Sequence, residues 1–185
     1  MIKVFPTDLS GMESLTHFFC FDNKLINFPK KWPKSIRHVD LSSNSIISVH
    51  SSNIISFTTN LNFLDISSNH IDYISPFFEN IPLDTLMVAN NRLSDFTFAL
   101  NLTSLKVLDL SKNLYFLFIY LFLFLFYFIL FHRLKSISPD ICLLSSTLEK
   151  LFLGRNMIES IPSSIGSLEK LTHLDLSGKK KRKSD

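Results

Sequence analysis

Histidine, cysteine and acidic side chains are the groups in this chain whose chemistry could support catalysis or metal binding. The sequence has six histidines and two cysteines, but it contains no G-x-S-x-G or H-E-x-x-H segment. Its four glycines are too dispersed for a phosphate-binding loop. His17 and His38, with Asp40 nearby, match a zinc site only weakly, and a solvated row of histidines is the better interpretation. We therefore predict no catalytic residues, no metal site and no cofactor.

These side chains lie within a pattern of apolar residues that recurs along the chain. Segment 36–49 follows the pattern L-x-x-L-x-L-x-x-N-x-L-x-x-L, with other aliphatic residues in several leucine positions. The first position of the pattern recurs at Leu15, Ile36, Leu61, Leu83, Leu105, Leu148 and Leu171. The intervals are 21, 25, 22, 22, 43 and 23 residues, and removing residues 114–132 shortens 43 to 24. All six then fall within the length of roughly 20–29 residues that one class of structural repeat has.

The first six copies also carry an asparagine at a fixed place after their apolar residues, where the seventh has Lys179. An asparagine amide both donates and accepts hydrogen bonds, so it can join backbone groups of neighbouring turns. These asparagines are Asn23, Asn44, Asn69, Asn91, Asn113 and Asn156. The pattern resembles the leucine-rich repeat, and the resemblance implies that the six side chains form an internal structural ladder.

The resemblance implies an α/β leucine-rich-repeat solenoid that is curved, with short parallel strands on its concave face. The sequence I-P-x-x-I-G-x-L-x-x-L in segment 158–171 is similar to the intracellular Ras-suppressor-like group. We assign repeats to 1–113, with a partial first copy and copies starting at 15, 36, 61, 83 and 105, and to 133–178. Both ends of the array fall within a repeat. We therefore also predict a fragment of a longer protein, or a gene model that carries an insertion at 114–132.

Segment 114–131 does not fit the repeat, because it has 18 residues without a charge, a glycine or a proline. As a helix it would measure about 27 Å, close to the thickness of a bilayer core. One interpretation is a transmembrane helix, and a second is a buried core element. The third is an in-frame insertion, such as a translated intron, that was not selected to fold with the repeats. We expect an apolar helix at about 114–131, projecting from the solenoid.

The outward positions of the strands are the predicted binding surface. Exposed aromatic residues among acidic ones suit protein binding, with the aromatic rings as anchors. The candidate partner-binding residues are Phe19, Phe21, His38, Asp40, Phe63, Asp65, Met87, Asp109, Phe152 and Asp175. We predict a non-enzymatic interaction scaffold or adaptor in intracellular signalling that binds another protein on the concave face. The alternatives are a membrane-anchored repeat protein and the targeting fragment of a larger signalling enzyme, such as a phosphatase or kinase.

Charge and cysteine usage limit the partners and the compartment. Without segment 179–185 the chain has 14 basic and 15 acidic residues, so the repeat body gives no reason to expect nucleic-acid binding. Cys20 and Cys142 lie five repeats apart, about 24 Å at the spacing of stacked strands, which is beyond disulfide reach. We expect a monomer in the cytoplasm, because no apolar signal-peptide core begins the chain. The alternatives are a membrane location, and a nuclear one through Lys179–Lys183.

Overall fold

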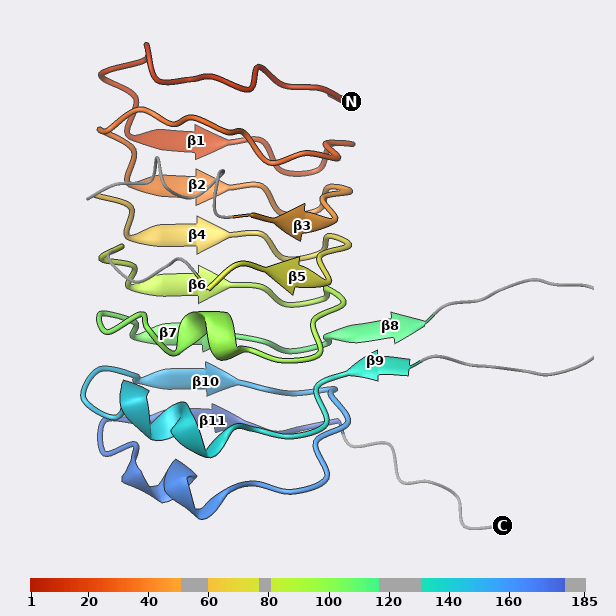
Figure 1. Cartoon of the computed structure of the whole chain (residues 1–185), viewed down its shortest axis with the longest axis vertical. Helices are drawn as coiled ribbons and strands as arrows, with labels where there is room; N and C mark the ends of the chain where they lie inside the picture. Colours follow the sequence, from red (N-terminus) through yellow and green to blue (C-terminus); the bar gives the residue numbers. More distant parts are fainter. Residues whose placement is uncertain (51–59, 77–80, 117–130, 179–185) are drawn as a thin grey trace, which may run out of the picture.

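The computed structural model describes residues 1–50, 60–76, 81–116 and 131–178. Its main feature is a parallel sheet of seven short strands, stacked one above another from the N-terminal to the C-terminal end (Figure 1). The strands are β1 (His17–Phe19), β2 (His38–Asp40), β4 (Phe63–Asp65), β6 (Thr85–Met87), β7 (Val107–Asp109), β10 (Lys150–Phe152) and β11 (His173–Asp175). Each strand begins two residues after the first apolar position of its repeat.

Strand alternation explains why each repeat buries its apolar residues. The middle residue of a strand points opposite to the first and third, and Val39, Leu64, Leu86, Leu108 and Leu151 at this position are all fully buried. Burying a side chain of this kind stabilises the fold by roughly 1.5–3 kcal/mol. Since every strand meets its neighbours in register, these side chains form one continuous core.

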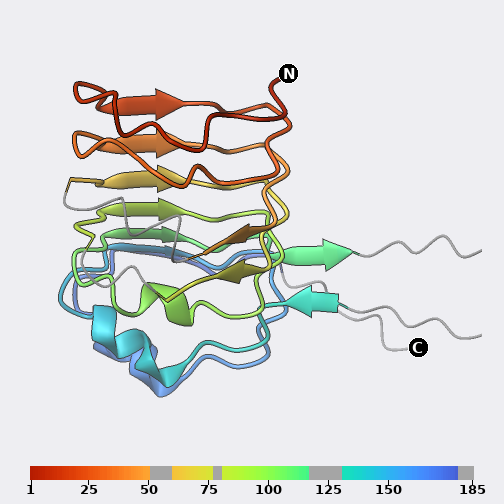
Figure 2. The same cartoon turned by 45° about the horizontal axis from the view of Figure 1, so that its top comes forward.

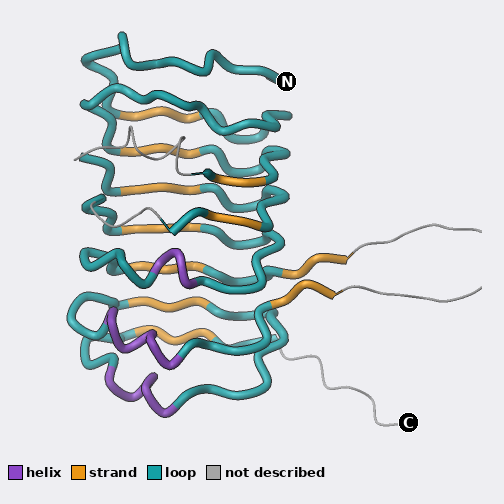
Figure 3. Tube along the Cα trace, viewed as in Figure 1, coloured by secondary structure: helices purple, strands orange, loops and turns teal. Residues whose placement is uncertain are grey.

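The return segments on the other side of the core carry smaller elements. Strands β3 (Ser48–Val49) and β5 (Tyr73–Ile74) form a second parallel pair, which Figure 2 shows apart from the main sheet. Three 3-10 helices lie on this side, namely η1 (Thr97–Ala99), η2 (Pro139–Leu144) and η3 (Ser163–Ser167) (Figure 3). The helices of the described residues are therefore 3-10 rather than α-helices. The predicted α/β class is right for the parallel sheet and too helical for the return segments, which are short enough for the tighter helix.

The predicted apolar helix is wrong where the structure describes its ends. Leu114–Phe116 forms β8 and Phe131–Arg133 forms β9, and the two pair antiparallel, with Leu114 opposite Arg133. Both strands project away from the stack, so they are not a core element (Figure 1). The solenoid fixes the two ends of this segment side by side, which favours backbone pairing between them. Residues 117–130 lie outside the described residues.

Membrane crossing was one interpretation of this segment. Across 1–50, 60–76, 81–116 and 131–178, no helix has the length and apolar character to cross a bilayer.

After β9 the chain resumes the repeat in register. The carbonyl of Leu134 accepts a hydrogen bond from the N–H of Met157, as the carbonyl of Leu25 does from Ser45 four repeats further up the stack. Ser136 forms a parallel bridge with Ser160. The main sheet continues from β7 directly to β10. The segment between Asn113 and Leu134 therefore leaves and re-enters the solenoid without displacing a strand.

Candidate functional site

The outward residues of the seven strands form one face of the sheet, which we call the open face. Its first row contains His17, His38, Phe63, Thr85, Val107, Lys150 and His173. Its second row contains Phe19, Asp40, Asp65, Met87, Asp109, Phe152 and Asp175. The pairing register places each residue directly beside the residue of its row on the next strand, about 4.8 Å away. Every predicted partner-binding residue lies in these rows except Phe21, which follows β1 by two residues.

Aromatic and imidazole rings gather on the strands nearest the N-terminus. The rings of His38 and Phe63 stack with centroids 3.9 Å apart and planes 5° apart. His17 lies on the other side of His38, and the two imidazole rings stack with their centroids 5.5 Å apart. Phe19 leans against His38 at 5.2 Å. We call His17, Phe19, His38 and Phe63 the ring cluster. His17 is the member that the predicted site omits, although it shares an outward position with His38 in the repeat.

The rings leave a large apolar area exposed. Phe19 is 57% exposed and Phe21 is 54% exposed, while His38 and Phe63 are half-buried. Among aromatic residues on the sheet, an exposure of this size is what a binding anchor would have before it meets its partner.

The aspartates of the second row hold the turn that follows each strand. Oδ1 of Asp40 accepts the backbone N–H of Ser42 at 2.9 Å, and Oδ1 of Asp65 accepts that of Ser67 at 2.8 Å. Asp109 and Asp175 make the same bond two residues further along. This Asx-turn geometry is a structural role that the prediction overlooked. The D-x-S spacing, present in all four copies, is the sequence signal that indicates it.

The electrostatics of the open face are set by burial and by like charges. Burial raises the pKa of Asp65, and the charges of Asp40 and Asp109 raise it further. The hydrogen bonds from Ser67 lower the pKa and partly oppose this shift. Burial and the nearby His17 lower the pKa of His38, although Asp40 and Asp65 oppose the shift. Because its pKa is lowered, His38 is neutral near pH 7 and does not compensate the negative charges of Asp40 and Asp65.

Salt bridges do not compensate the acidic row either. Within the described residues the salt bridges are Lys31–Asp8 and Lys106–Asp84, and neither involves an aspartate of the open face. The same residues contain no group of three or more histidine, cysteine or acidic side chains placed to hold a metal ion. His17 and His38 stack on each other instead of converging on a point.

The predicted ladder asparagines lie on the inner side of the turns. Nδ2 of Asn69 donates to the carbonyl of Leu41 in the preceding repeat at 3.0 Å and to that of Ile66 in its own repeat at 3.1 Å. Its Oδ1 accepts the N–H of Ile46 from the preceding repeat at 3.0 Å. Asn23, Asn44, Asn91 and Asn113 accept a backbone N–H of the preceding repeat in the same way. The five asparagines from Asn44 onward are buried, and Asn23 is half-buried.

Asn156 makes only part of this pattern. Its Nδ2 donates to the carbonyls of Leu110 and Leu153, both at 2.9 Å. Its Oδ1 is buried and finds no donor among the residues that the structure describes. For Asn44, Asn69, Asn91 and Asn113 the donor is the residue two after the preceding ladder asparagine, which here is Tyr115 in β8. The projecting segment therefore removes one hydrogen bond from the ladder.

A left-handed residue precedes each ladder asparagine. Asp22, Ser43, Ser68, Asn90, Lys112 and Arg155 all have φ between 54° and 57°. This conformation turns the chain off the strand and directs the asparagine inward. It costs a residue with a side chain about 1–2 kcal/mol, which the buried bonds of the following asparagine offset.

Comparisons with known proteins agree with this geometry. The family model of the Leucine Rich Repeat matches residues 60–81 and 147–168. The matched repeats and the parallel stack show leucine-rich repeats and the fold they form, which confirms the predicted resemblance. No match distinguishes the Ras-suppressor-like group, so that subgroup stays a prediction.

A solved structure has the same fold over nearly the whole chain. A leucine-rich repeat protein of Leptospira interrogans superposes with a TM-score of 0.68 at 20% identity, covering 95% of this chain and 46% of that protein. The chain thus spans just under half the length of this relative. A comparison with curated proteins finds no significant match.

Proposed function

We propose that this chain is a non-enzymatic interaction module that binds a partner protein on the open face. The observation that carries the proposal is the ring cluster on a sheet face that also holds uncompensated aspartates. A protein gains nothing in folding stability by leaving Phe19 and Phe21 more than half exposed. Burying such rings in a complex would remove apolar surface from water, which is the main favourable term in association.

The rigidity of the open face supports the same function. All strands of the sheet between β1 and β11 are paired on both sides, and Asp40 and Asp65 are fixed by a bond to their own turn. Binding therefore orders few additional groups, so less conformational entropy is lost on association. Leucine-rich repeat domains generally mediate protein–protein interaction, which is consistent with this function.

We place the module in intracellular signalling, in the cytoplasm. Both cysteines are free thiols, Cys20 buried and Cys142 half-buried, as is usual for a protein kept in a reducing compartment. Burial raises the pKa of Cys20, which favours its inert thiol form. Anchoring to a membrane has no support from the described residues.

Photo-crosslinking tests the proposal with a matched pair of positions. Phe19 on the open face and Tyr73 on β5 are aromatic and 57% and 50% exposed, so p-benzoylphenylalanine at either site should be tolerated. The probe at Phe19 is expected to capture a discrete partner in cells, and the probe at Tyr73 is not. Capture from Tyr73 alone, or equal capture of the same partner from both positions, would contradict the assignment of the open face.

A further inference from the structure

The two ends of the open face differ in what surrounds their aspartates. On β2 and β4, Asp40 and Asp65 lie side by side in register, and the ring pair His38 and Phe63 lies beside them. Asp175 on β11 has Phe152 as its neighbour in the row and the exposed His173 on its own strand. Only the first end combines adjacent carboxylates with stacked rings.

The acidic pair, Asp40 and Asp65, has no cationic partner in the described part of the chain. The two carboxylates carry like charges on adjacent strands, and neither takes part in the salt bridges of the described residues. Asp65 is also partly withdrawn from water, as its raised pKa reflects. A cationic group brought by a partner would relieve the repulsion and make charge-assisted hydrogen bonds to the carboxylates.

The rings define what must accompany that cation. Phe63 and Asp65 are two residues apart on one strand, as are His38 and Asp40, so the Cα atoms of each pair are about 6.6–6.8 Å apart along the strand. An extended partner segment has the same separation between its own residues i and i+2. It can therefore place an apolar side chain on the ring cluster and a cation on the acidic pair at the same time.

We infer that the open face binds an extended segment of a partner protein with an apolar residue, any residue, and then an arginine, seated on the ring cluster and on Asp40 and Asp65. The cation is arginine rather than lysine because the planar guanidinium binds carboxylates bidentately, whereas the lysine ammonium is a point charge. This inference rests on the proposed function and specifies the partner chemistry of the same surface.

Fluorescence anisotropy with defined peptides tests the inference on the whole chain. The probe is a labelled peptide of repeated Leu-Ser-Arg-Ser units, which alternates leucine and arginine on one side of an extended chain. One comparison peptide replaces arginine with glutamate. The other, of Leu-Arg-Ser-Ser units, keeps the composition but makes leucine and arginine adjacent. We expect the first peptide to bind at least tenfold more tightly than either comparison peptide.

Variants locate the binding on the surface. Replacing Asp40 and Asp65 together by asparagine removes the charges but keeps an oxygen that can accept the N–H of Ser42 and Ser67, so the turns are retained. This double variant is expected to weaken binding at least tenfold. The matched double variant of Asp109 and Asp175, which hold their turns in the same way, should change it less than twofold.

Three outcomes would overturn the inference. They are equal binding of the glutamate peptide, equal binding of the peptide with adjacent leucine and arginine, and equal effects of the two double variants. If the arginine peptide does not bind while the probe at Phe19 still captures a partner, the partner chemistry is wrong and the binding face stands. If capture at Phe19 also fails, the proposed function fails with it.

Discussion

The ladder asparagines and the open-face aspartates lie on the two sides of the same turn, but their hydrogen bonds have different structural roles. Asn69 is buried and hydrogen-bonds to the backbone of two repeats. Asp65 lies four residues earlier, and within the described residues its side chain hydrogen-bonds to Ser67 of its own turn. Loss of the first disturbs the junction between repeats, whereas loss of the second stays local. The inner row thus carries the fold and leaves the outer row able to vary.

The outer row shows this variation within one chain. Phe19, Met87 and Phe152 take the place of aspartate, and the strands that carry them still pair in register. The ladder position varies less, because six of the seven copies have asparagine there and only the last has another residue, Lys179. A surface that can change its side chains without changing the stack can evolve toward a partner.

The largest effect is expected from breaking the inner row. Asn69→Ala leaves the N–H of Ile46 without a partner in the core, while the carbonyl of Leu41 keeps only the donor from Asn44. An unpaired buried group costs about 1–3 kcal/mol and a lost hydrogen bond about 0.5–1.5 kcal/mol, so the free energy of unfolding should fall by about 2–4 kcal/mol. Urea denaturation measures it. Asp65→Ala, which loses one bond at the surface, should cost about 1 kcal/mol or less, and an equal cost for both variants would contradict the distinction.

A second ladder position tests whether the missing bond at Asn156 is real. Asn156→Ala loses only the two donor bonds, to Leu110 and Leu153, because its Oδ1 has no donor to lose. It should therefore destabilise the chain by about 1–2 kcal/mol less than Asn69→Ala does. The same denaturation experiment compares them, and an equal or greater loss at Asn156 would mean that its oxygen is paired.

Removing residues 114–132 should restore the ladder. The deletion joins Asn113 to Arg133 and places the N–H of Leu134 two residues after Asn113, where it can donate to Oδ1 of Asn156. We expect a folded chain with a free energy of unfolding about 1 kcal/mol higher. Thermal and urea unfolding would measure it. A deletion of 114–131, one residue shorter, shifts Leu134 out of register and serves as the control, which should be less stable than the longer deletion.

The smallest effect concerns the charge of Asp65. Because burial raises its pKa in the fold, the folded state binds this proton more tightly than the unfolded state does. The contribution of Asp65 to stability therefore falls as the pH rises through the folded pKa. Asp65→Asn removes that penalty and can keep the turn, so at pH 7 it should be as stable as the parent chain or more stable by about 0.5 kcal/mol.

The pH profile provides the control for this prediction. The advantage of Asp65→Asn should disappear as the parent carboxyl becomes protonated at acid pH. Urea midpoints measured from pH 7 down to the acid limit of folding would show it. An advantage that persists unchanged at low pH would assign the effect to packing instead of charge.

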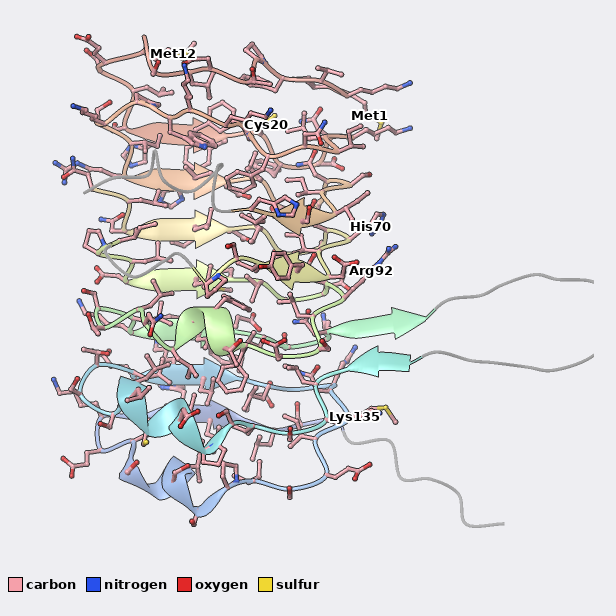
Figure 4. All side chains as sticks on the ribbon, in the orientation of Figure 1. Met1, Met12, Cys20, His70, Arg92 and Lys135 are labelled. Carbon is pink, nitrogen blue, oxygen red and sulfur yellow. The ribbon has the colours of Figure 1, made fainter. Side chains whose placement is uncertain are left out.

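The parallel stack could be predicted from the sequence because an asparagine recurs at a fixed place in the repeat. The interval between first positions and the asparagine that follows identify a strand and a turn in each copy, whatever the surface residues are. The position of Leu134 in the fifth repeat follows from the same count. In Figure 4, His70, Arg92 and Lys135 lie on the side of the stack toward which the strands of the main sheet point.

Other features depend on contacts that one-dimensional patterns do not contain. The paired ends of the projecting segment follow from where the solenoid holds Leu114 and Arg133, not from their apolar neighbours, which suggested a helix. The stacking of His38 on Phe63 depends on the register of two strands and on side-chain rotamers. The burial of Asp65 depends on the two adjacent strands, which place Asp40 and Met87 beside it.

Hydroxyl-radical footprinting of the chain, alone and bound to the partner captured at Phe19, tests the central claim most directly. Phe19, Phe21 and Tyr73 are 57%, 54% and 50% exposed, so their rings should oxidise at similar rates in the free chain. If the open face is the binding surface, the partner will slow oxidation of Phe19 and Phe21 several-fold and leave Tyr73 unchanged. Protection of Tyr73 with Phe19 and Phe21 still reactive would contradict it.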